Sequence, residues 1–249
     1  MEKRVIMSKL PTLTTDRLVL RAFTLDDAPR VQALAGRMEI ARTTLTIPHP
    51  YEDGMAEEWI STHAQDFENQ QVLNLAICLR DGLLIGAIGL MPELEHRRAE
   101  IGYWVGMEYW GHGYCTEAAQ AVMQYGFKEL GLERIYGFHF SNNPASGRVM
   151  EKLGMEKEGV MRRHIQKWGQ RCDVVCYGIL RDEYYARAGA RLKSDAEIQK
   201  ACGRSRAGNR ERDCGRDCFP SDRRTAGCPW HCRSGAGRLP SQGHPSAYL

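Results

Sequence analysis

Residues 100–130 read EIGYWVGMEYWGHGYCTEAAQAVMQYGFKEL, and they carry the strongest fold signal in the chain. An apolar run, a loop with Gly111 and Gly113, and a helical pattern predict a buried strand, a loop and a helix. The first N–H groups of a helix lack intrahelical acceptors, and the peptide dipoles add positive charge there. Glycine lets the backbone approach a bulky ligand and adopt positive φ. The loop therefore predicts an anion site, with a phosphate as its ligand.

The residues around the two glycines narrow the kind of phosphate site. No Gly-Lys-Ser/Thr follows, which argues against a P-loop, and the spacing is wrong for a Rossmann dinucleotide site. The sequence WGHG at 110–113, with Thr116 and Glu117 opening the helix, resembles the acyl-CoA pyrophosphate loop of the GNAT superfamily of N-acetyltransferases. That pattern is Gln/Arg-x-x-Gly-x-Gly/Ala, and Glu108 stands here at its first position. This departure removes one expected polar or basic contact.

The resemblance implies that acetyl-CoA is the cosubstrate. Its pyrophosphate would lie on the loop amides, and its pantetheine arm would pair with backbone freed where the fourth and fifth strands splay. The implied cofactor-binding residues are Trp104, Val105, Trp110, Gly111, His112, Gly113, Tyr114, Cys115 and Asn143. No metal is expected in this domain.

A second motif follows the fifth predicted strand. Asn143 is a good N-cap and Pro144 a good first helical residue, which predicts a short helix ending at Gly154. The string from Asn143 through Ser146 to the sequence EKLGM at 151–155 resembles the second CoA motif of the superfamily. Many members carry a tyrosine here that protonates the departing thiolate, but Met150 occupies that position. The ribosomal-protein branch of the family implies Ser146 as the donor; the alternative for both motif residues is helix capping alone.

Glu100 is the candidate general base, because a carboxylate at the start of a buried strand is unusual. The implied reaction is direct attack of an amine on the thioester, so a group must take the amine proton. An α-amino group has a pKa of about 7.7–8.0 and a lysine about 10.4, so one carboxylate acting through water would suffice for a peptide N-terminus. The alternative is a surface ion pair with Arg97 or Arg98.

The other segments predict an α/β (α+β) fold: a single GNAT-type domain with a mixed, mostly antiparallel twisted sheet of about seven strands flanked by helices. Alternation and apolar runs predict the strands 12–23, 72–79, 83–91, 99–105, 134–140, 160–165 and 172–180. Caps and 3.6-residue periodicity predict the helices 24–34, 52–67, 116–130 and 144–153. The prolines of 41–50 predict an exposed loop. The position of the helix 52–67 after it resembles the region that lines the acceptor groove in this superfamily; the alternative is that Trp59 is a core residue and His49 an exposed loop residue.

The domain organisation follows from an uneven composition. Residues 1–186 carry 21 Lys+Arg and 25 Asp+Glu, a net charge of −4, whereas 187–249 carry 13 and 6, a net charge of +7. The segment 187–249 has only five Leu, Ile, Val or Phe residues in 63, too few to build a core. We expect a GNAT N-acetyltransferase domain at 12–185 and a basic Arg/Gly/Cys-rich tail at 187–249, disordered or the product of a shifted reading frame.

The cysteines of the tail raise one alternative. Cys214 and Cys218, followed by Cys228 and Cys232 with His231 beside them, have spacing compatible with zinc. Zinc modules also carry strands and a small apolar cluster, which this segment lacks, so a solvated basic tail is favoured. Nonspecific nucleic-acid contact is disfavoured, because few aromatic residues are available for base stacking.

The predicted function is transfer of an acetyl group from acetyl-CoA to a primary amine. A protein N-terminal α-amine of the ribosomal-protein type is favoured, because the opening TLTTDRLVLRAF resembles that branch and the acidic domain would attract basic partners. The alternatives are a small amine, such as a polyamine or an aminoglycoside, and a CoA-binding sensor whose chemistry has decayed. No signal peptide or membrane span is visible, so the cytoplasm is expected. The sequence leaves monomer and homodimer open.

Overall fold

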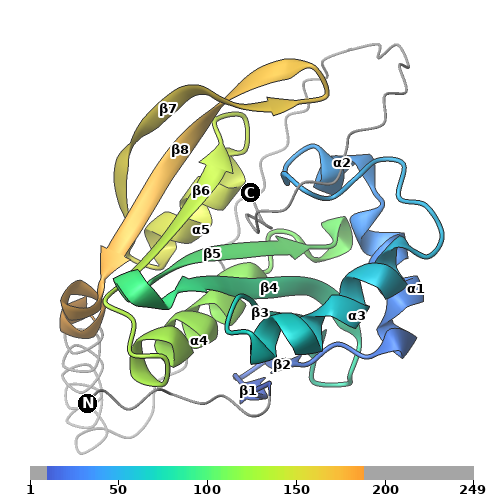
Figure 1. Cartoon of the computed structure of the whole chain (residues 1–249), viewed down its shortest axis with the longest axis horizontal. Coiled ribbons are helices and arrows are strands. Elements are labelled where there is room, and N and C mark those ends of the chain that lie inside the picture. The colour runs from blue at the N-terminus through green and yellow to red at the C-terminus, as the bar shows by residue number, and fades with distance from the viewer. Residues whose placement is uncertain (1–9, 188–249) are drawn as a thin grey trace, which may run out of the picture. The chain divides into compact units, whose positions relative to one another are not determined.

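A computed structural model describes residues 10–187 of the chain (Figure 1). Eight strands form one sheet in the order β1-β2-β3-β4-β5-β6-β8-β7. Neighbouring strands are antiparallel except for the parallel pair β5–β6. The strands are β1 Leu13–Thr14, β2 Leu18–Arg21, β3 Leu73–Leu79, β4 Leu84–Glu93, β5 Arg98–Val105, β6 Arg134–Phe140, β7 Glu156–Lys167 and β8 Gln170–Leu180. The predicted α/β class and mostly antiparallel sheet are confirmed.

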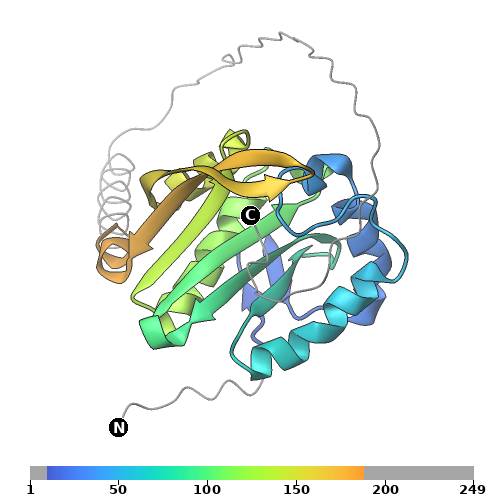
Figure 2. The same ribbon diagram turned by 45° about the horizontal axis from the view of Figure 1, so that its top comes forward.

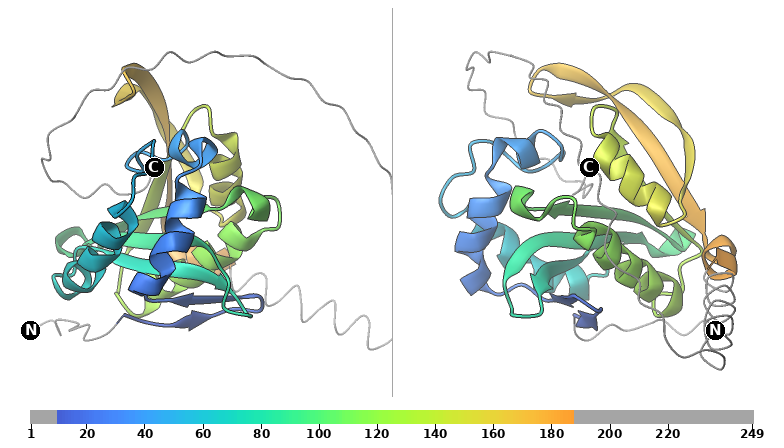
Figure 3. Two further views of the ribbon diagram at one scale, coloured as in Figure 1. Left: turned by 90° about the vertical axis from the view of Figure 1, so that its right-hand side faces the viewer. Right: turned by 180° about the vertical axis from the view of Figure 1, so that it is seen from behind.

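Helices cover both faces of this sheet. The helices are α1 Ala28–Ala35, α2 Met38–Ala41, α3 Met55–Glu68, α4 Tyr114–Lys128 and α5 Pro144–Lys152, and residues 181–187 are also helical. Single 3-10 turns span Leu25–Asp27, Leu94–His96 and Met107–Tyr109. Seen from behind, α4 and α5 lie in front of the sheet, while α1 and α3 pack mainly on the opposite face (Figure 3).

The sheet has one strand more than expected, because the predicted strand 12–23 divides in two. The backbone N–H of Thr15 donates to the Leu18 carbonyl at 3.0 Å, and the Thr15 hydroxyl accepts the Leu18 N–H at 3.0 Å. These bonds close a tight turn between β1 and β2. The short helix α2 was not predicted, and β7 and β8 extend beyond the predicted strands 160–165 and 172–180.

The core consists of two large apolar clusters, one on each face of the sheet. On the first face, the stripe predicted along α4 is buried, with Val122 and Phe127 fully enclosed against β4 and β5. On the second face, α1 and α3 pack over the middle of the sheet. A Cβ at Gly86 of β4 would collide with the Trp104 carbonyl oxygen, so glycine at this position allows close contact with β5.

Several expectations concern residues outside those described. The tail at 187–249, apart from Arg187, lies outside them, as do the candidate zinc ligands Cys214, Cys218, Cys228, Cys232 and His231. Within residues 10–187, Cys78, Cys115, Cys172 and Cys176 are free thiols. None of the helices in that range is both long enough and apolar enough to cross a membrane.

Candidate active site

The sheet opens between β5 and β6. The two strands pair only at their beginnings, from Arg98↔Arg134 to Glu100↔Tyr136. Beyond these positions β5 continues against β4 and β6 continues against β8, so the two strands diverge (Figure 1). The predicted splay is therefore present, with Glu100 at its closed end and Val105 at its open end.

The glycine loop lies immediately after the open end of β5. Gly111 and Gly113 both have φ +79°, and Gly113 is the N-cap of α4. The first backbone hydrogen bond into this helix runs from the Glu117 N–H to the Gly113 carbonyl. Among the described residues, none accepts a hydrogen bond from the backbone N–H groups of 111–116. A Cβ at Gly111 would meet only open space.

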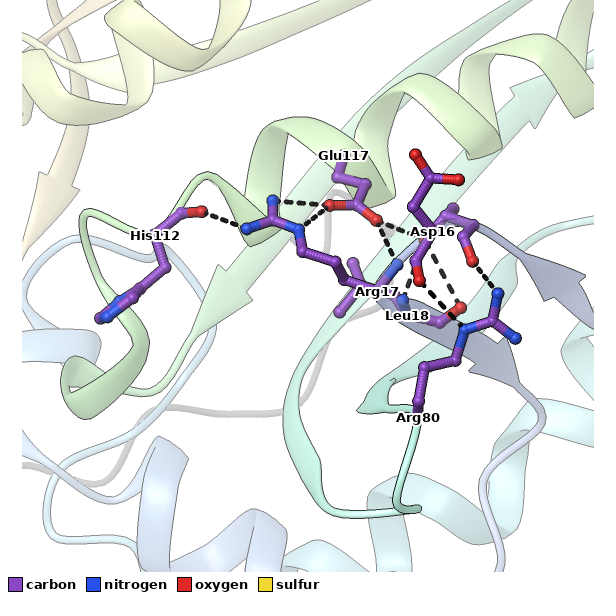
Figure 4. A network of polar contacts seen from close by, with 7 residues as sticks. Asp16, Arg17, Leu18, Arg80, His112 and Glu117 are labelled. Carbon is purple, nitrogen blue, oxygen red and sulfur yellow. Dashed lines mark hydrogen bonds and ion pairs between the residues drawn. The ribbon is translucent and has the colours of Figure 1, made fainter. Parts of the chain in front are cut away.

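An ion pair fixes this loop to the start of β2 (Figure 4). Glu117, in the first turn of α4, lies 2.6 Å from the Arg17 guanidinium and accepts the Arg17 backbone N–H at 2.9 Å. The same guanidinium donates to the His112 carbonyl at 2.9 Å and lies over the Tyr114 ring. Thr15 adds a 2.6 Å hydrogen bond to Glu117. Arg17 was not predicted as a site residue.

This network keeps Glu117 ionised and places the positive charge of Arg17 beside the loop. Partial burial opposes ionisation of Glu117, but hydrogen bonds from Thr15 and Arg17 outweigh it and hold the pKa of its carboxyl below the ordinary value. The Arg17 side chain is 49% exposed, so its cation is accessible beside the free loop amides. Glu108, where the family pattern places Gln or Arg, is exposed.

One backbone group at the open end of the splay is already engaged. The indole N–H of Trp110 donates to the Val105 carbonyl at 2.6 Å. The Val105 carbonyl was expected to be free, but a carbonyl oxygen has two lone pairs and can accept a second hydrogen bond. The side chain of Trp104 is buried on the α1 and α3 face of the sheet.

Glu100 lies on that same face, at the closed end of the splay. Its cross-strand neighbour Met91 packs in the cluster that includes Trp104, and cross-strand neighbours share a face of a sheet. Burial raises the pKa of Tyr136, the partner of Glu100 on β6, and the Glu93 and Glu100 carboxylates raise it further. Glu100 is only 6% exposed, which argues against the alternative of a surface ion pair. The two arginines proposed for that pair bind other carboxylates: Arg97 binds Glu133 and Arg98 binds Glu93.

A pair of hydroxyls lies on the opposite face. The Tyr103 hydroxyl is 3.0 Å from the Ser146 hydroxyl and 3.2 Å from the Ser146 carbonyl oxygen. Burial raises the pKa of Tyr103, so its phenol is protonated at neutral pH. The predicted cap is also present, since the Asn143 side chain accepts the Ser146 N–H at 3.4 Å. Met150 is buried in the core, so the phenol near Ser146 comes from β5 and not from α5.

A cavity of about 350 Å³ opens beside Trp104 on the face that carries Glu100. Its walls come from α1, from the loop between α2 and α3, from α3 itself and from Trp104 of β5. Among the described residues that line it, most are apolar and Glu58 is the one charged side chain. The lining residues are Val31, Ala35, Thr46, Ile47, Pro48, Tyr51, Met55, Glu58, Trp59, Thr62 and Trp104.

Comparison with known proteins identifies the family. Residues 17–156 match the model of the acetyltransferase (GNAT) domain. The chain belongs to the GNAT acetyltransferase family. An uncharacterized N-acetyltransferase of Bacillus subtilis (strain 168), YoaA, is 36% identical over 173 residues, which cover 69% of this chain and 97% of YoaA. The family match and the N-acetyltransferase relatives show that this protein is an acyltransferase.

Two further relatives of this GNAT enzyme differ in their named acceptors. YdaF of B. subtilis (strain 168), provisionally named a ribosomal N-acetyltransferase, is 36% identical over 107 residues, 43% of this chain and 58% of YdaF. The spermidine N(1)-acetyltransferase of Escherichia coli (strain K12) is 33% identical over 107 residues, also 43% of this chain and 58% of the relative.

Solved structures share the GNAT fold. A GNAT-family acetyltransferase from Bacillus anthracis aligns with a TM-score of 0.63 and 26% identity, over 69% of this chain and 99% of the other. The microcin C7 self-immunity acetyltransferase MccE, solved with acetyl-CoA and AMP, aligns with a TM-score of 0.62 and 20% identity, over 67% of this chain and 93% of MccE. Among residues 10–187, no cluster of three or more His, Cys, Asp or Glu side chains has metal-binding geometry.

Proposed function

We propose that this enzyme transfers the acetyl group of acetyl-CoA directly to the N-terminal α-amine of a protein, of the ribosomal-protein type. The observation that carries the proposal is the set of backbone N–H groups at 111–116, which have no acceptor within residues 10–187 and lie beside the splay of β5 and β6. These donors suit a diphosphate, because they combine unsatisfied N–H groups with the positive end of a helix. Arg17 adds a cation beside them, which compensates for the acidic residue at Glu108.

The proposed catalytic residues lie on opposite faces of the sheet, on either side of the splay. In the proposed reaction the amine nitrogen attacks the acetyl carbonyl carbon, the carbon–sulfur bond breaks, and the amine loses a proton while the CoA thiolate gains one. Glu100 accepts the amine proton, through water, on the face with the apolar cavity. Ser146 gives a proton to the thiolate on the opposite face, and Tyr103 replaces it across their 3.0 Å contact. The cycle closes when Glu100 releases the amine proton to solvent and Tyr103 regains a proton from solvent as the products leave.

The acceptor assignment has two sources of support. The relative YdaF is provisionally named as a ribosomal N-acetyltransferase. An α-amine also has a lower pKa than a lysine side chain, so it is easier to deprotonate at neutral pH. The spermidine acetyltransferase similarity favours a polyamine as the second candidate. A panel of peptides with free N-termini, spermidine and an aminoglycoside, assayed for CoA release, separates these acceptors. CoA binding without turnover on any of them would favour a decayed sensor.

The loop assignment is tested by two variants at opposite ends of one helix. Gly111→Asp and Gly131→Asp both place a carboxylate at a position of positive φ where a Cβ meets open space, and both change the net charge equally. We expect Gly111→Asp to weaken CoA binding in calorimetry by roughly tenfold or more, because a carboxylate there repels the diphosphate. Gly131→Asp, at the far end of α4, should change affinity by less than about twofold. Equal effects would reject the loop assignment.

A further inference from the structure

The pairing of β7 with β8 is irregular at two places, between Lys157 and Gly159 and between Met161 and Ile165, and the second irregularity is the larger. Met161 pairs with Val174 and Ile165 pairs with Cys172, so three residues of β7 stand opposite the single residue Asp173. These three residues are Arg162, Arg163 and His164, and all are exposed. We call them the basic bulge. Bulges redirect side chains out of the regular alternation of a strand.

The basic bulge has an unusual backbone conformation. Arg163 has φ +51°, in the left-handed region that costs a residue with a Cβ about 1–2 kcal/mol. The Arg163 N–H donates to the Asp173 carboxylate at 2.7 Å, which holds this conformation. Strain of this kind persists where surrounding contacts impose it, and it is concentrated at functional positions.

The charge of the bulge is not balanced locally. Residues 159–173 contain Arg162, Arg163, His164, Lys167 and Arg171, and Asp173 is the one acidic residue among them. Within residues 10–187, none of the ion pairs formed involves a side chain of the bulge. Residues 1–186 together have a net negative charge, so the β7–β8 hairpin is a local basic region on an acidic domain.

The bulge lies at the edge of the face that carries Glu100. Met161 and Ile165, which flank it, pack on Phe140 of β6 together with Leu45 from the loop after α2. Phe140 shares a face with Tyr136, four residues earlier on β6 and the partner of Glu100. The end of the β7–β8 hairpin approaches α2 (Figure 2), and Lys167 near its tip donates to the Leu45 carbonyl at 3.2 Å.

The strand register gives the approximate separation of the bulge from Glu100. The bulge is about five residues along the sheet from the level of Glu100 and Tyr136, roughly 17 Å, and three strands across from β5, roughly 14 Å, so about 22 Å in all. An extended peptide rises about 3.4 Å per residue, so a chain whose amine is near Glu100 reaches this distance in about six or seven residues. Because the arginine side chains are long, they can meet side chains of the peptide somewhat closer to its amine, at about positions three to six.

We propose that the basic bulge binds an acidic segment of the acceptor protein, at about positions three to six after the acetylated amine. This inference rests on the proposed function and adds the chemical class of the acceptor. Unpaired arginines at an exposed edge are suited to carboxylates, and such complementarity selects partners and accelerates their encounter.

The test uses three peptides that differ only at positions three to six, which are all Glu, all Gln or all Lys behind an N-terminal alanine. At low salt, the full chain should have a kcat/KM for the Glu peptide about tenfold above that for the Gln peptide. The difference should lie in KM, and it should stay near tenfold because each exposed ion pair contributes little. Arg162→Glu should remove or reverse this preference. The control Lys157→Glu makes the same charge change on the same exposed strand, before the bulge.

A second variant separates binding from folding. Arg163→Gly should lower the preference for the Glu peptide while keeping or raising the melting temperature, because glycine relaxes φ +51°. Equal rates on the Glu and Gln peptides would overturn the inference and leave the proposed function standing. Equal effects of Arg162→Glu and Lys157→Glu, or a change in the KM for acetyl-CoA in place of the peptide KM, would also overturn it. Turnover of spermidine and of no peptide would overturn the proposed function itself.

Discussion

We expect His63 to make the fold, and the cavity beside Trp104, sensitive to acid. It lies on α3, is 4% exposed, and contacts Phe23 and Trp59 edge to face, with ring centroids 5.3 and 4.4 Å away. Neither ring nitrogen has a hydrogen-bond partner among the described residues. Burial lowers the pKa of His63 to about 4, with Asp66 opposing the shift. Because Trp59 lines the cavity, protonation of His63 would disturb the wall of the proposed acceptor site.

The magnitude follows from proton linkage. An unfolded histidine has a pKa near 6.5, so between about pH 6.5 and pH 4 the unfolded state binds a proton that the folded state does not. Stability is therefore lost as the pH falls through this window. A difference of about 2.5 pKa units corresponds to about 3 kcal/mol, of which about 2.5 kcal/mol is lost between pH 7.5 and pH 4.5.

The experiment compares the wild type with His63→Phe, which keeps an aromatic ring in the cluster and removes the titration. Urea unfolding at pH 7.5, 6, 5 and 4.5 should show the stability gap between the two proteins widening in favour of the variant by about 2.5 kcal/mol on acidification. The exposed His96→Gln serves as the control and should follow the wild type. Parallel pH profiles of wild type and His63→Phe would show that His63 is not the acid-sensitive group.

Two further predictions concern the site. Arg17→Met should raise the Kd for CoA about fivefold, since the ion pair that fixes the loop is half-exposed and contributes about 1 kcal/mol; unchanged affinity in calorimetry would remove Arg17 from the site. Tyr103→Phe should lower kcat about tenfold without changing the KM for acetyl-CoA, because a thiol with a pKa near 8.5 is already a fair leaving group. The same substitution should have little further effect in the Ser146→Ala background, and additive effects would contradict a shared proton path.

The amino-acid sequence alone was enough to predict the strand, glycine loop and helix at 100–130, and the capped helix at Asn143. These features depend on residues close together in the chain: positive φ at Gly111, the Asn143 cap, and the apolar stripe of α4. Local chemistry of this kind can be read from spacing alone. The family resemblance added the acetyl-CoA assignment and the splay, which local patterns do not contain.

The residues that complete the site come together only in three dimensions. Arg17 binds Glu117 from 100 positions away, and Tyr103 meets Ser146 across 43 positions. The basic bulge likewise depends on how β7 pairs with β8. Contacts of this kind depend on strand order and register, which the packing of the whole core fixes and which a short window of sequence does not encode. The chemistry available at each position can therefore be read along the chain, whereas the partners of each side chain are set by the fold.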